Sequence, residues 1–205
     1  MAAKINTFFW IVILLCVSFT PLHAQDRLFE LSVRASSLSS TGYYGGDNGY
    51  IGAGINTELL YFIKPKIGMG IFYTHTLTAL SDSNFESGNA GLAGDFESQM
   101  YGLAVQATTD RARLFRVYGT VRLFKVELVH HYKDLNFSIG ESGYGYSAGL
   151  GVTLKISNTL GFNLLEVNYV GLPGNSTYTK QFDEKSNNSG IQIQSGFLFK
   201  IRKRK

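Results

Sequence analysis

His75 is a candidate enzyme base, because it stands in the sequence THT shortly before Ser81 and Asp82. A hydrolytic site needs a nucleophile, a base and an orienting acid in mutual contact. Side chains that share a face of an extended segment are two residues apart, and no histidine and serine of this chain have that spacing. We therefore expect no catalytic residue among them.

His130 and His131, in the sequence VHHYKD with Asp134, have the side chains of a metal site. Adjacent residues of a strand point to opposite faces, so the two imidazoles would point apart. The glycine pairs GAG, GMG, GYG and GLG would indicate a nucleotide site only between a strand and a helix, a context that this sequence lacks. We expect neither a metal nor a cofactor.

Residues 1–24 have the three parts of a secretory signal peptide. Lys4 and the amino terminus are followed by FFWIVILLCVSF, which is uncharged but shorter than the ~20 residues of a membrane-spanning helix. The sequence LHAQ then offers a cleavage site between Ala24 and Gln25. The sequence predicts a signal peptide over 1–24 and one domain over 25–205.

Export limits what the mature chain can do. The only cysteine, Cys16, leaves with the signal, so neither a disulfide nor thiol chemistry remains. Of the 19 basic residues only Lys4 is removed, which leaves 18 basic against 15 acidic residues. This small excess argues against a nucleic-acid partner, and the closing RKRK would lie beside lipid phosphates instead.

The body of the chain repeats an apolar residue at every second position, which is the signature of strands. Most of these segments have 10 to 14 residues, close to the roughly 9 to 11 that a tilted membrane-crossing strand needs. There are eight such segments, at about 28–38, 50–63, 67–79, 98–108, 114–126, 144–156, 161–170 and 190–201.

The connections between these segments alternate in length. Three are short, such as Lys64 to Lys66 and Ser157 to Thr159, and four are long and polar. Short turns at one rim and long loops at the other are typical of an outer-membrane barrel. A soluble sandwich has the same apolar and polar faces, so the segment length, the sorted connections and the signal peptide together decide for the barrel.

Aromatic residues fall toward both rims, as the interface girdles of a membrane barrel do. Strands also favour aromatic residues for their own sake, so this observation adds support only. The predicted lipid-interface aromatics are Phe29, Tyr61, Tyr73, Tyr101, Phe115, Tyr144, Tyr146, Tyr169, Phe197 and Phe199.

The segments GYGYSAGLGVTLKIS and NTLGFNLLEVNY and the closing GFLFKI resemble the small eight-stranded outer-membrane barrels of Gram-negative bacteria. This porin-like group is related in shape to the transmembrane domain of OmpA and to OmpX and OmpW. The resemblance implies an all-β, antiparallel, up-and-down barrel in the cell outer membrane that binds no cofactor. It also implies contact with lipid, lipopolysaccharide and the barrel-assembly machinery, in a monomer. Such chains usually end on an aromatic residue, whereas here KIRKRK follows Phe199.

Charged residues on the polar faces would point into the lumen, which in eight strands is only wide enough for side chains. Buried charges must be paired, so we expect a structural plug, with a gated polar pathway as the alternative. The predicted lumen network consists of Glu30, Arg34, Glu58, Gln106, Arg122, Lys155 and Glu166, with Lys200 as a further candidate.

The expected function is non-enzymatic, in envelope structure or in surface interaction through external loops whose ligand is unknown. A narrow or lateral channel for a small or apolar solute is the first alternative. Some barrels of the group modify lipid A, so a lipid-modifying enzyme that uses His75 or His131 is a second. A soluble lipocalin-like carrier is a third, and it would require the apolar faces to point inward.

Overall fold

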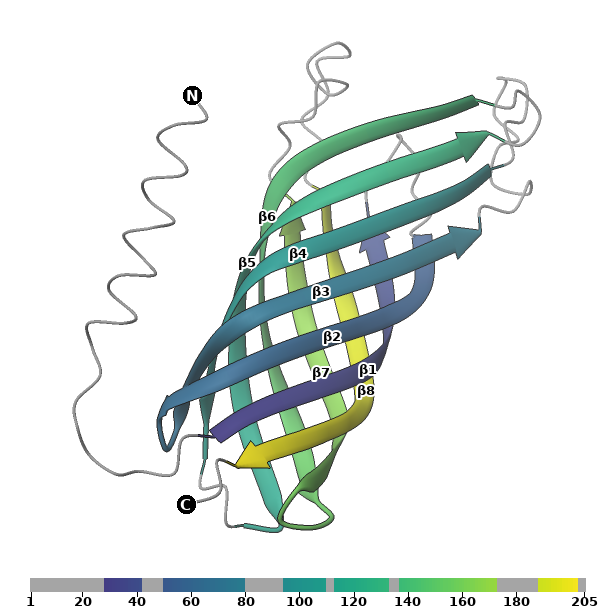
Figure 1. Ribbon diagram of the computed structural model, residues 1–205. Coiled ribbons are helices and arrows are strands. Elements are labelled where there is room, and N and C mark those ends of the chain that lie inside the picture. Colours follow the sequence, from purple (N-terminus) through teal and green to yellow (C-terminus); the bar gives the residue numbers. More distant parts are fainter. Residues whose placement is uncertain are drawn as a thin grey trace, which may run out of the picture.

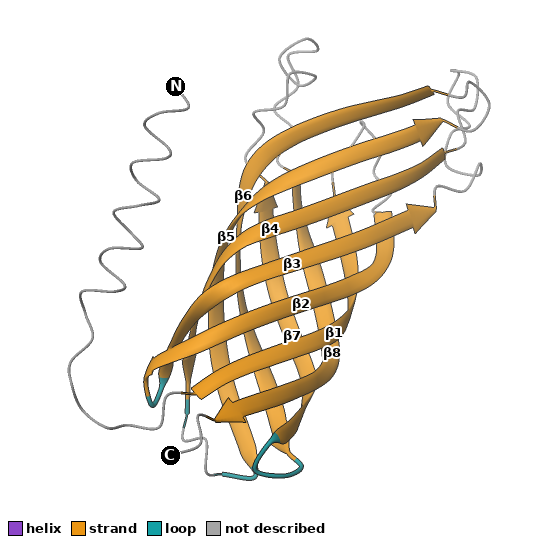
Figure 2. Ribbon diagram, in the orientation of Figure 1, coloured by secondary structure: helices purple, strands orange, loops and turns teal. Residues whose placement is uncertain are grey.

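The computed structural model describes residues 28–41, 50–79, 94–109, 113–132, 137–172 and 188–202. These residues form eight antiparallel strands in a closed barrel, each paired with its neighbour in sequence (Figures 1 and 2). The strands are β1 (Leu28–Thr41), β2 (Tyr50–Lys64), β3 (Ile67–Ala79), β4 (Gly94–Thr108), β5 (Phe115–Tyr132), β6 (Phe137–Lys155), β7 (Leu160–Leu172) and β8 (Asn188–Arg202). The predicted signal peptide lies outside the described residues.

The barrel closes through β1 and β8, whose register runs from Leu28 opposite Arg202 to Thr41 opposite Ser189. Closure pairs both sides of every strand, so no sheet edge is left to hydrogen-bond with lipid or with another chain. No helix among the described residues is long and apolar enough to cross a membrane. The structure therefore confirms the predicted all-β barrel.

The short turns lie at one end of the barrel, which we call the short-turn end (Figure 1). The first residue of β1 and the last residue of β8 lie at the same end. The turn between β6 and β7 is held by Ser157, whose Oγ accepts hydrogen bonds from the backbone N–H groups of Thr159 and Leu160. In barrels of this architecture such turns face the periplasm. Three of the four connections expected to be long leave the opposite end, the loop end, and most of their residues lie outside the described ranges. The fourth, expected over 127–143, leaves the same end but is largely strand, because β5 continues to Tyr132 and β6 begins at Phe137.

The outer face of the barrel is apolar and the inner face is largely polar, the reverse of a soluble protein. Large apolar side chains are exposed on the outside, and Leu150 (70 %) and Leu123 (62 %) are among the most open. Inside, glutamate, arginine, asparagine and glutamine side chains are buried. This distribution requires an apolar solvent around the barrel, so the soluble-carrier alternative is wrong.

Part of the lumen is apolar, a feature that is not predicted from the sequence. A buried cluster lines the inner wall mainly on β2 to β5, and the rings of Phe72 and Phe124 meet edge to face at 5.9 Å. The cluster consists of Leu60, Phe62, Phe72, Met100, Ala104, Phe124, Val126 and Val170. Glycines opposite these side chains make room for them; Gly145, for example, lies against the Phe124 ring.

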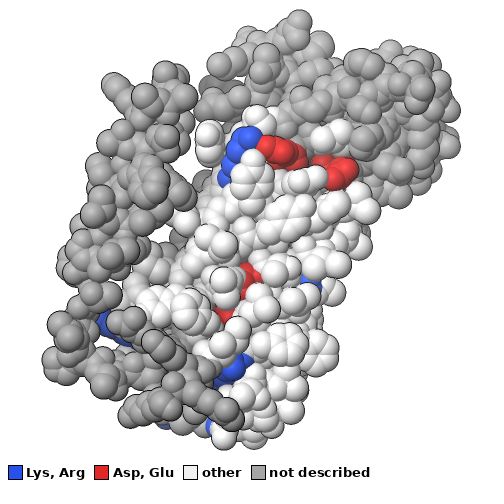
Figure 3. All heavy atoms as spheres, viewed as in Figure 1, with Lys and Arg blue, Asp and Glu red and all other residues white. Residues whose placement is uncertain are grey.

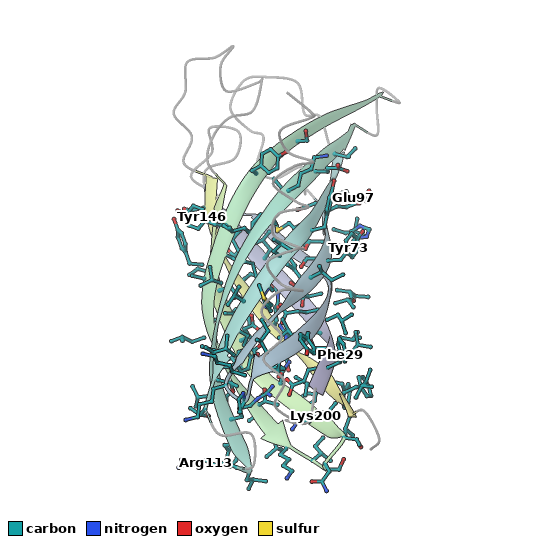
Figure 4. The ribbon with its side chains drawn as sticks, turned by 60° about the vertical axis from the view of Figure 1, so that its left-hand side comes forward. Phe29, Tyr73, Glu97, Arg113, Tyr146 and Lys200 are labelled. Atoms are coloured by element: carbon teal, nitrogen blue, oxygen red, sulfur yellow. The ribbon has the colours of Figure 1, made fainter. Side chains whose placement is uncertain are left out.

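The predicted interface aromatics all have their side chains on the outside of the barrel. Phe29 and Tyr61 stack near the short-turn end with ring centroids 5.0 Å apart, and Tyr146 and Tyr169 pack at 6.5 Å nearer the loop end. Figure 4 shows Phe29 low on the barrel and Tyr73 and Tyr146 high on it. Their position at two lipid interfaces stays a prediction.

Candidate functional site

Four charged side chains meet in the lumen and form a closed ring of alternating sign, which we call the lumen ring. Arg34 contacts Glu58 (Nη2 to Oε1, 3.1 Å) and Glu166 (Nη1 to Oε2, 2.6 Å). Arg122 contacts the same two carboxylates, Glu58 (Nε to Oε2, 2.8 Å) and Glu166 (Nη2 to Oε1, 2.7 Å). Each arginine thus bridges both glutamates, and the formal charges cancel.

The strand register explains why these side chains converge. Arg34 is on β1, Glu58 on β2, Arg122 on β5 and Glu166 on β7, all on the inward-facing set of positions. β1 and β2 lie across the barrel from β5, so only long side chains can bridge the lumen. Small residues stand beside them on neighbouring strands: Gly196 opposite Arg34, Ala104 opposite Arg122 and Gly151 opposite Glu166.

Neutral groups add hydrogen bonds to the ring, although the buried Arg34 Nε has no hydrogen-bond partner among the described residues. The hydroxyl of Tyr118 donates to Glu166 Oε2 at 2.7 Å. Arg34 Nη1 donates to Gln194 Oε1 at 3.2 Å, and Arg122 Nη1 donates to Asn168 Oδ1 at 2.9 Å. The Arg122 guanidinium also lies 5.5 Å from the centre of the Phe72 ring. Charge-assisted bonds of this kind hold each planar group in one orientation.

Chemically, the ring is suited to closing the lumen. Each of its four members is at most 2 % exposed, so water does not reach their charges from either end. Burial of a charge is tolerated only with a partner and hydrogen bonds, and here every charge has two partners of opposite sign. An acid or base for catalysis would need access to a substrate, which this arrangement does not provide.

A second ion pair lies between the ring and the short-turn end. Arg116 Nη1 contacts both carboxylate oxygens of Glu30 at 2.8 Å, and its guanidinium lies 5.9 Å from the Tyr118 ring centre. Arg116 is not among the lumen residues predicted from the sequence. The period of two would have revealed it, because positions 116, 118 and 122 of β5 share one face.

The predicted lumen residues therefore have different fates. Glu30, Arg34, Glu58, Arg122 and Glu166 form the two ion-pair systems. Gln106 is buried in the lumen, but its side chain donates no hydrogen bond to the ring. Lys155 lies at the short-turn end of β6, partly exposed, and forms no ion pair with the described residues. It is outside the network because the strand carries it to the mouth of the barrel.

Further buried polar pairs were missed by sequence reasoning as well. Asn56 donates to Thr74 Oγ1 at 2.7 Å across β2 and β3, and Gln192 donates to Ser36 Oγ at 3.0 Å across β8 and β1. Both pairs join inward-facing residues of adjacent strands. Alternation along the strands predicts that Asn56, Thr74 and Gln192 lie on polar, inward faces, but it does not indicate which side chains meet.

His75 lies on the outer surface and contacts an acid that the sequence did not suggest. Its Nε2 is 3.2 Å from Glu97 Oε1, with side-chain exposures of 37 % and 23 %, and Gln99 Nε2 donates to the same oxygen. Within the described ranges no serine or threonine hydroxyl hydrogen-bonds to His75. Ser81, Asp82 and Asp134 and the side chains of His130 and His131 lie outside the described residues, among which no metal-binding group of three was found.

Comparison with protein-family models and with curated protein sequences returns no match. Among solved structures the chain is similar to Neisserial surface protein A, with 14 % identity, a TM-score of 0.63 and coverage of 84 % of this chain and 97 % of that one. It is also similar to the attachment invasion locus protein Ail of Yersinia pestis, in complex with the heparin analogue sucrose octasulfate. The identity is 10 %, the TM-score is 0.55, and the match covers 86 % of this chain and 100 % of that one. A third similar structure is the outer membrane protein OprG from Pseudomonas aeruginosa, with 12 % identity, a TM-score of 0.52 and coverage of 87 % of this chain and 98 % of that one.

The shared architecture and the apolar exterior place this chain in the class of integral outer-membrane β-barrels with eight strands. This agrees with the class and the outer-membrane location predicted from the sequence. At these identities the likeness concerns the fold, and the role of the barrel has to come from its own residues.

Proposed function

We propose that this protein is a closed, non-enzymatic outer-membrane barrel that serves the envelope as a scaffold for its external loops. The observation that carries the proposal is the lumen ring, in which Arg34, Glu58, Arg122 and Glu166 meet from opposite walls with at most 2 % exposure. A neutral, fully paired ring supports a plug, because an ion would have to break buried ion pairs to pass.

Conductance measurements test the plug. Purified wild-type barrel in planar bilayers is expected to show no ion steps. The double variant Arg122→Ala with Glu58→Ala removes two long side chains and keeps the ring neutral, so it is expected to conduct. Both proteins are first shown to be folded by their mobility with and without boiling. Ion steps in the wild type that the variant alters would favour the gated pathway instead.

The loops are the part of such a barrel that meets the exterior. Cells that produce the wild type or a variant with residues 173–187 replaced by a short turn provide the test. We expect the variant to fold and to change adhesion or resistance to detergents. A fully wild-type phenotype for variants in all four connections at the loop end would contradict the loop role. Lipopolysaccharide and the assembly machinery are the proposed partners of the barrel wall.

The apolar inner wall favours a second candidate, a route for a small apolar solute. Phe72, Phe124 and Val126 present a buried apolar surface beside the lumen ring. Uptake of a fluorescent apolar solute into barrel-containing liposomes distinguishes the two functions. The plug predicts uptake equal to that of empty liposomes, whereas faster uptake that a Val126→Asp variant abolishes would establish the route.

The non-enzymatic part of the proposal is tested separately. His75 and Glu97 form a contact near the outer lipid interface, and a lipid-modifying enzyme would use such a pair. Mass spectrometry of lipid A from cells with and without the protein is expected to show one identical species pattern. A modified lipid A that disappears in the His75→Ala or His131→Ala variant would make this barrel an enzyme.

A further inference from the structure

We propose that the short-turn end of the barrel binds the phosphate groups of anionic phospholipids in the inner leaflet of the membrane. The cationic rim has an exposed part, Lys64, Lys66 and Arg113, which we expect to meet the headgroups. Its remaining members, Lys155 and the buried Lys200, add positive charge at the barrel mouth. The proposal concerns the barrel mouth and its lipid collar, and it holds whether or not the lumen conducts.

Two of the short turns carry the exposed part of the rim. Lys64 ends β2 and Lys66 precedes β3, with only Pro65 between them, and both lysines are exposed. Arg113 stands two residues before β5 and is also exposed. These three cations come from two adjacent strand pairs, since β3 pairs with β4 and β4 with β5.

The other two cations belong to the mouth itself. Lys155 ends β6, and its backbone N–H donates to Leu114 O at 2.8 Å, one residue from Arg113. Lys200 lies on β8, largely buried, and its backbone N–H donates to Thr159 O at 2.7 Å in the turn between β6 and β7. Figure 4 shows Arg113 and Lys200 at the lower end of the barrel. The backbone bonds fix both strands at the rim.

The described charges are unequal at the two ends. At the short-turn end the described carboxylate is Glu30, and Arg116 occupies both of its oxygens. Near the loop end the outer wall carries Glu97, and Glu127 with Lys125. Figure 3 shows acidic and basic side chains next to one another high on the barrel. Among the described residues the short-turn end therefore carries more cations than carboxylates.

The neighbours of the exposed cations indicate a lipid surface as the partner. Ile63 and Ile67 flank the Lys64 to Lys66 turn, and Leu114 and Phe115 follow Arg113; all four are large, apolar and exposed. Apolar residues next to lysine and arginine are the pattern of side chains that contact acyl chains while their cations reach the headgroups. A site for a free soluble anion would not need this apolar border.

Lipid selectivity measures the interaction directly. The full-length folded barrel is placed in phosphatidylcholine bilayers, and electron spin resonance gives the association of spin-labelled phosphatidylglycerol relative to spin-labelled phosphatidylcholine. We expect the wild type to prefer phosphatidylglycerol. The preference should fall when salt rises from 0.1 M to 1 M, because screening shortens from about 10 Å to about 3 Å.

Matched variants identify the surface. Lys64→Gln with Lys66→Gln and Arg113→Gln should lower the preference at least about fivefold, the effect of a single cation near an anionic surface. The charge-keeping variant Lys64→Arg with Lys66→Arg, and Lys125→Gln on the outer wall, should keep it. Mobility without boiling shows that each variant is folded.

Three results would overturn the proposal. The first is equal association of the two lipids with the wild type, and the second is a full preference in the triple glutamine variant. The third is loss of the preference on adding millimolar glycerol phosphate, at constant ionic strength, which would make the ligand a soluble phosphate. Retention of the preference with glycerol phosphate and its loss in the triple variant would establish the lipid site.

Discussion

Tyr118 on β5 reaches across β6 to Glu166 on β7, and it can do so because Gly151 lies between them. Tyr118 pairs with Gly151, and Gly151 pairs with Glu166, so the three residues form one row across three strands. The tyrosine ring covers the glycine, and its hydroxyl donates to Glu166 Oε2 at 2.7 Å. The absence of a side chain at one position thus completes the lumen ring on another strand.

Replacing Gly151 with alanine should destabilise the barrel. A Cβ there would lie 2.5 Å from the Tyr118 hydroxyl oxygen, so the ring would have to move away from Glu166. Overpacking of this kind costs about 1–3 kcal/mol. Urea unfolding in detergent, followed by the mobility of unboiled samples, gives the change. Gly143→Ala on the same strand is the control, because its Cβ would meet Val126 at 3.9 Å; equal losses would refute the argument.

Glu166→Gln should lower stability strongly, because it leaves the charges of Arg34 and Arg122 with one glutamate to share. Breaking one side of a buried ion pair costs about 3–5 kcal/mol. Adding Arg34→Gln restores neutrality, so the double variant should be more stable than the sum of the single effects predicts, by about 0.5–3 kcal/mol.

The same urea unfolding completes this double-mutant cycle. Glu127→Gln on the outer wall, where Lys125 is the partner, should leave the free energy of unfolding unchanged. Strict additivity of Glu166→Gln and Arg34→Gln would mean that the lumen ring is not an energetic unit.

Adjacent residues of β3 should respond very differently to truncation. Phe72 is 6 % exposed and packs in the lumen against Phe124 and the Arg122 guanidinium, whereas Ile71 is 59 % exposed on the outer face. Phe72→Ala creates an internal cavity and should cost about 3–5 kcal/mol. Ile71→Ala exchanges contacts with lipid and should cost far less. If Ile71→Ala lowered the free energy of unfolding in lipid vesicles more than Phe72→Ala did, the outer face and not the lumen would be the packed core of the barrel.

A charge on the outer face should be costly in a way that depends on depth. Leu150 lies five residues and Tyr144 eleven residues from the short-turn end of β6, and both are exposed on the outer face. Leu150→Arg near the middle of the bilayer should cost about 2–4 kcal/mol, and Tyr144→Arg near its surface about 0–1 kcal/mol. Folding into lipid vesicles under urea measures both. A protein surrounded by water would accept arginine equally well at either position.

The period of two predicted the strands and the inward face of most of the lumen charges correctly for a local reason. Successive side chains of a strand alternate between faces, so Arg34, Glu58 and Glu166 were assigned to the inside without knowledge of their partners. The error at Lys155 has a different cause. Alternation places Lys155 on the inward face, but Lys155 is the last residue of β6. At this position the inward face borders the open mouth of the barrel and not the closed lumen.

Pairing across the lumen was beyond sequence reasoning. Arg34 and Glu166 are 132 residues apart, and Arg122 and Glu58 are 64 apart. Whether such side chains meet depends on the tilt and stagger of the strands. Tilt and stagger decide which residues of different strands lie at the same height along the barrel axis. The same stagger brings Phe72 and Phe124 together in an apolar part of the inner wall, which the sequence of a single strand does not predict.

The amino-acid sequence therefore dictated which face of each strand meets lipid, because that choice depends only on neighbours along the chain. The closed barrel decided which charges neutralise one another and which stay at the rim. Ion pairing needs contact at about 3 Å between groups from different strands, and register and closure create that contact. The lumen ring and the cationic rim are both products of this one geometry.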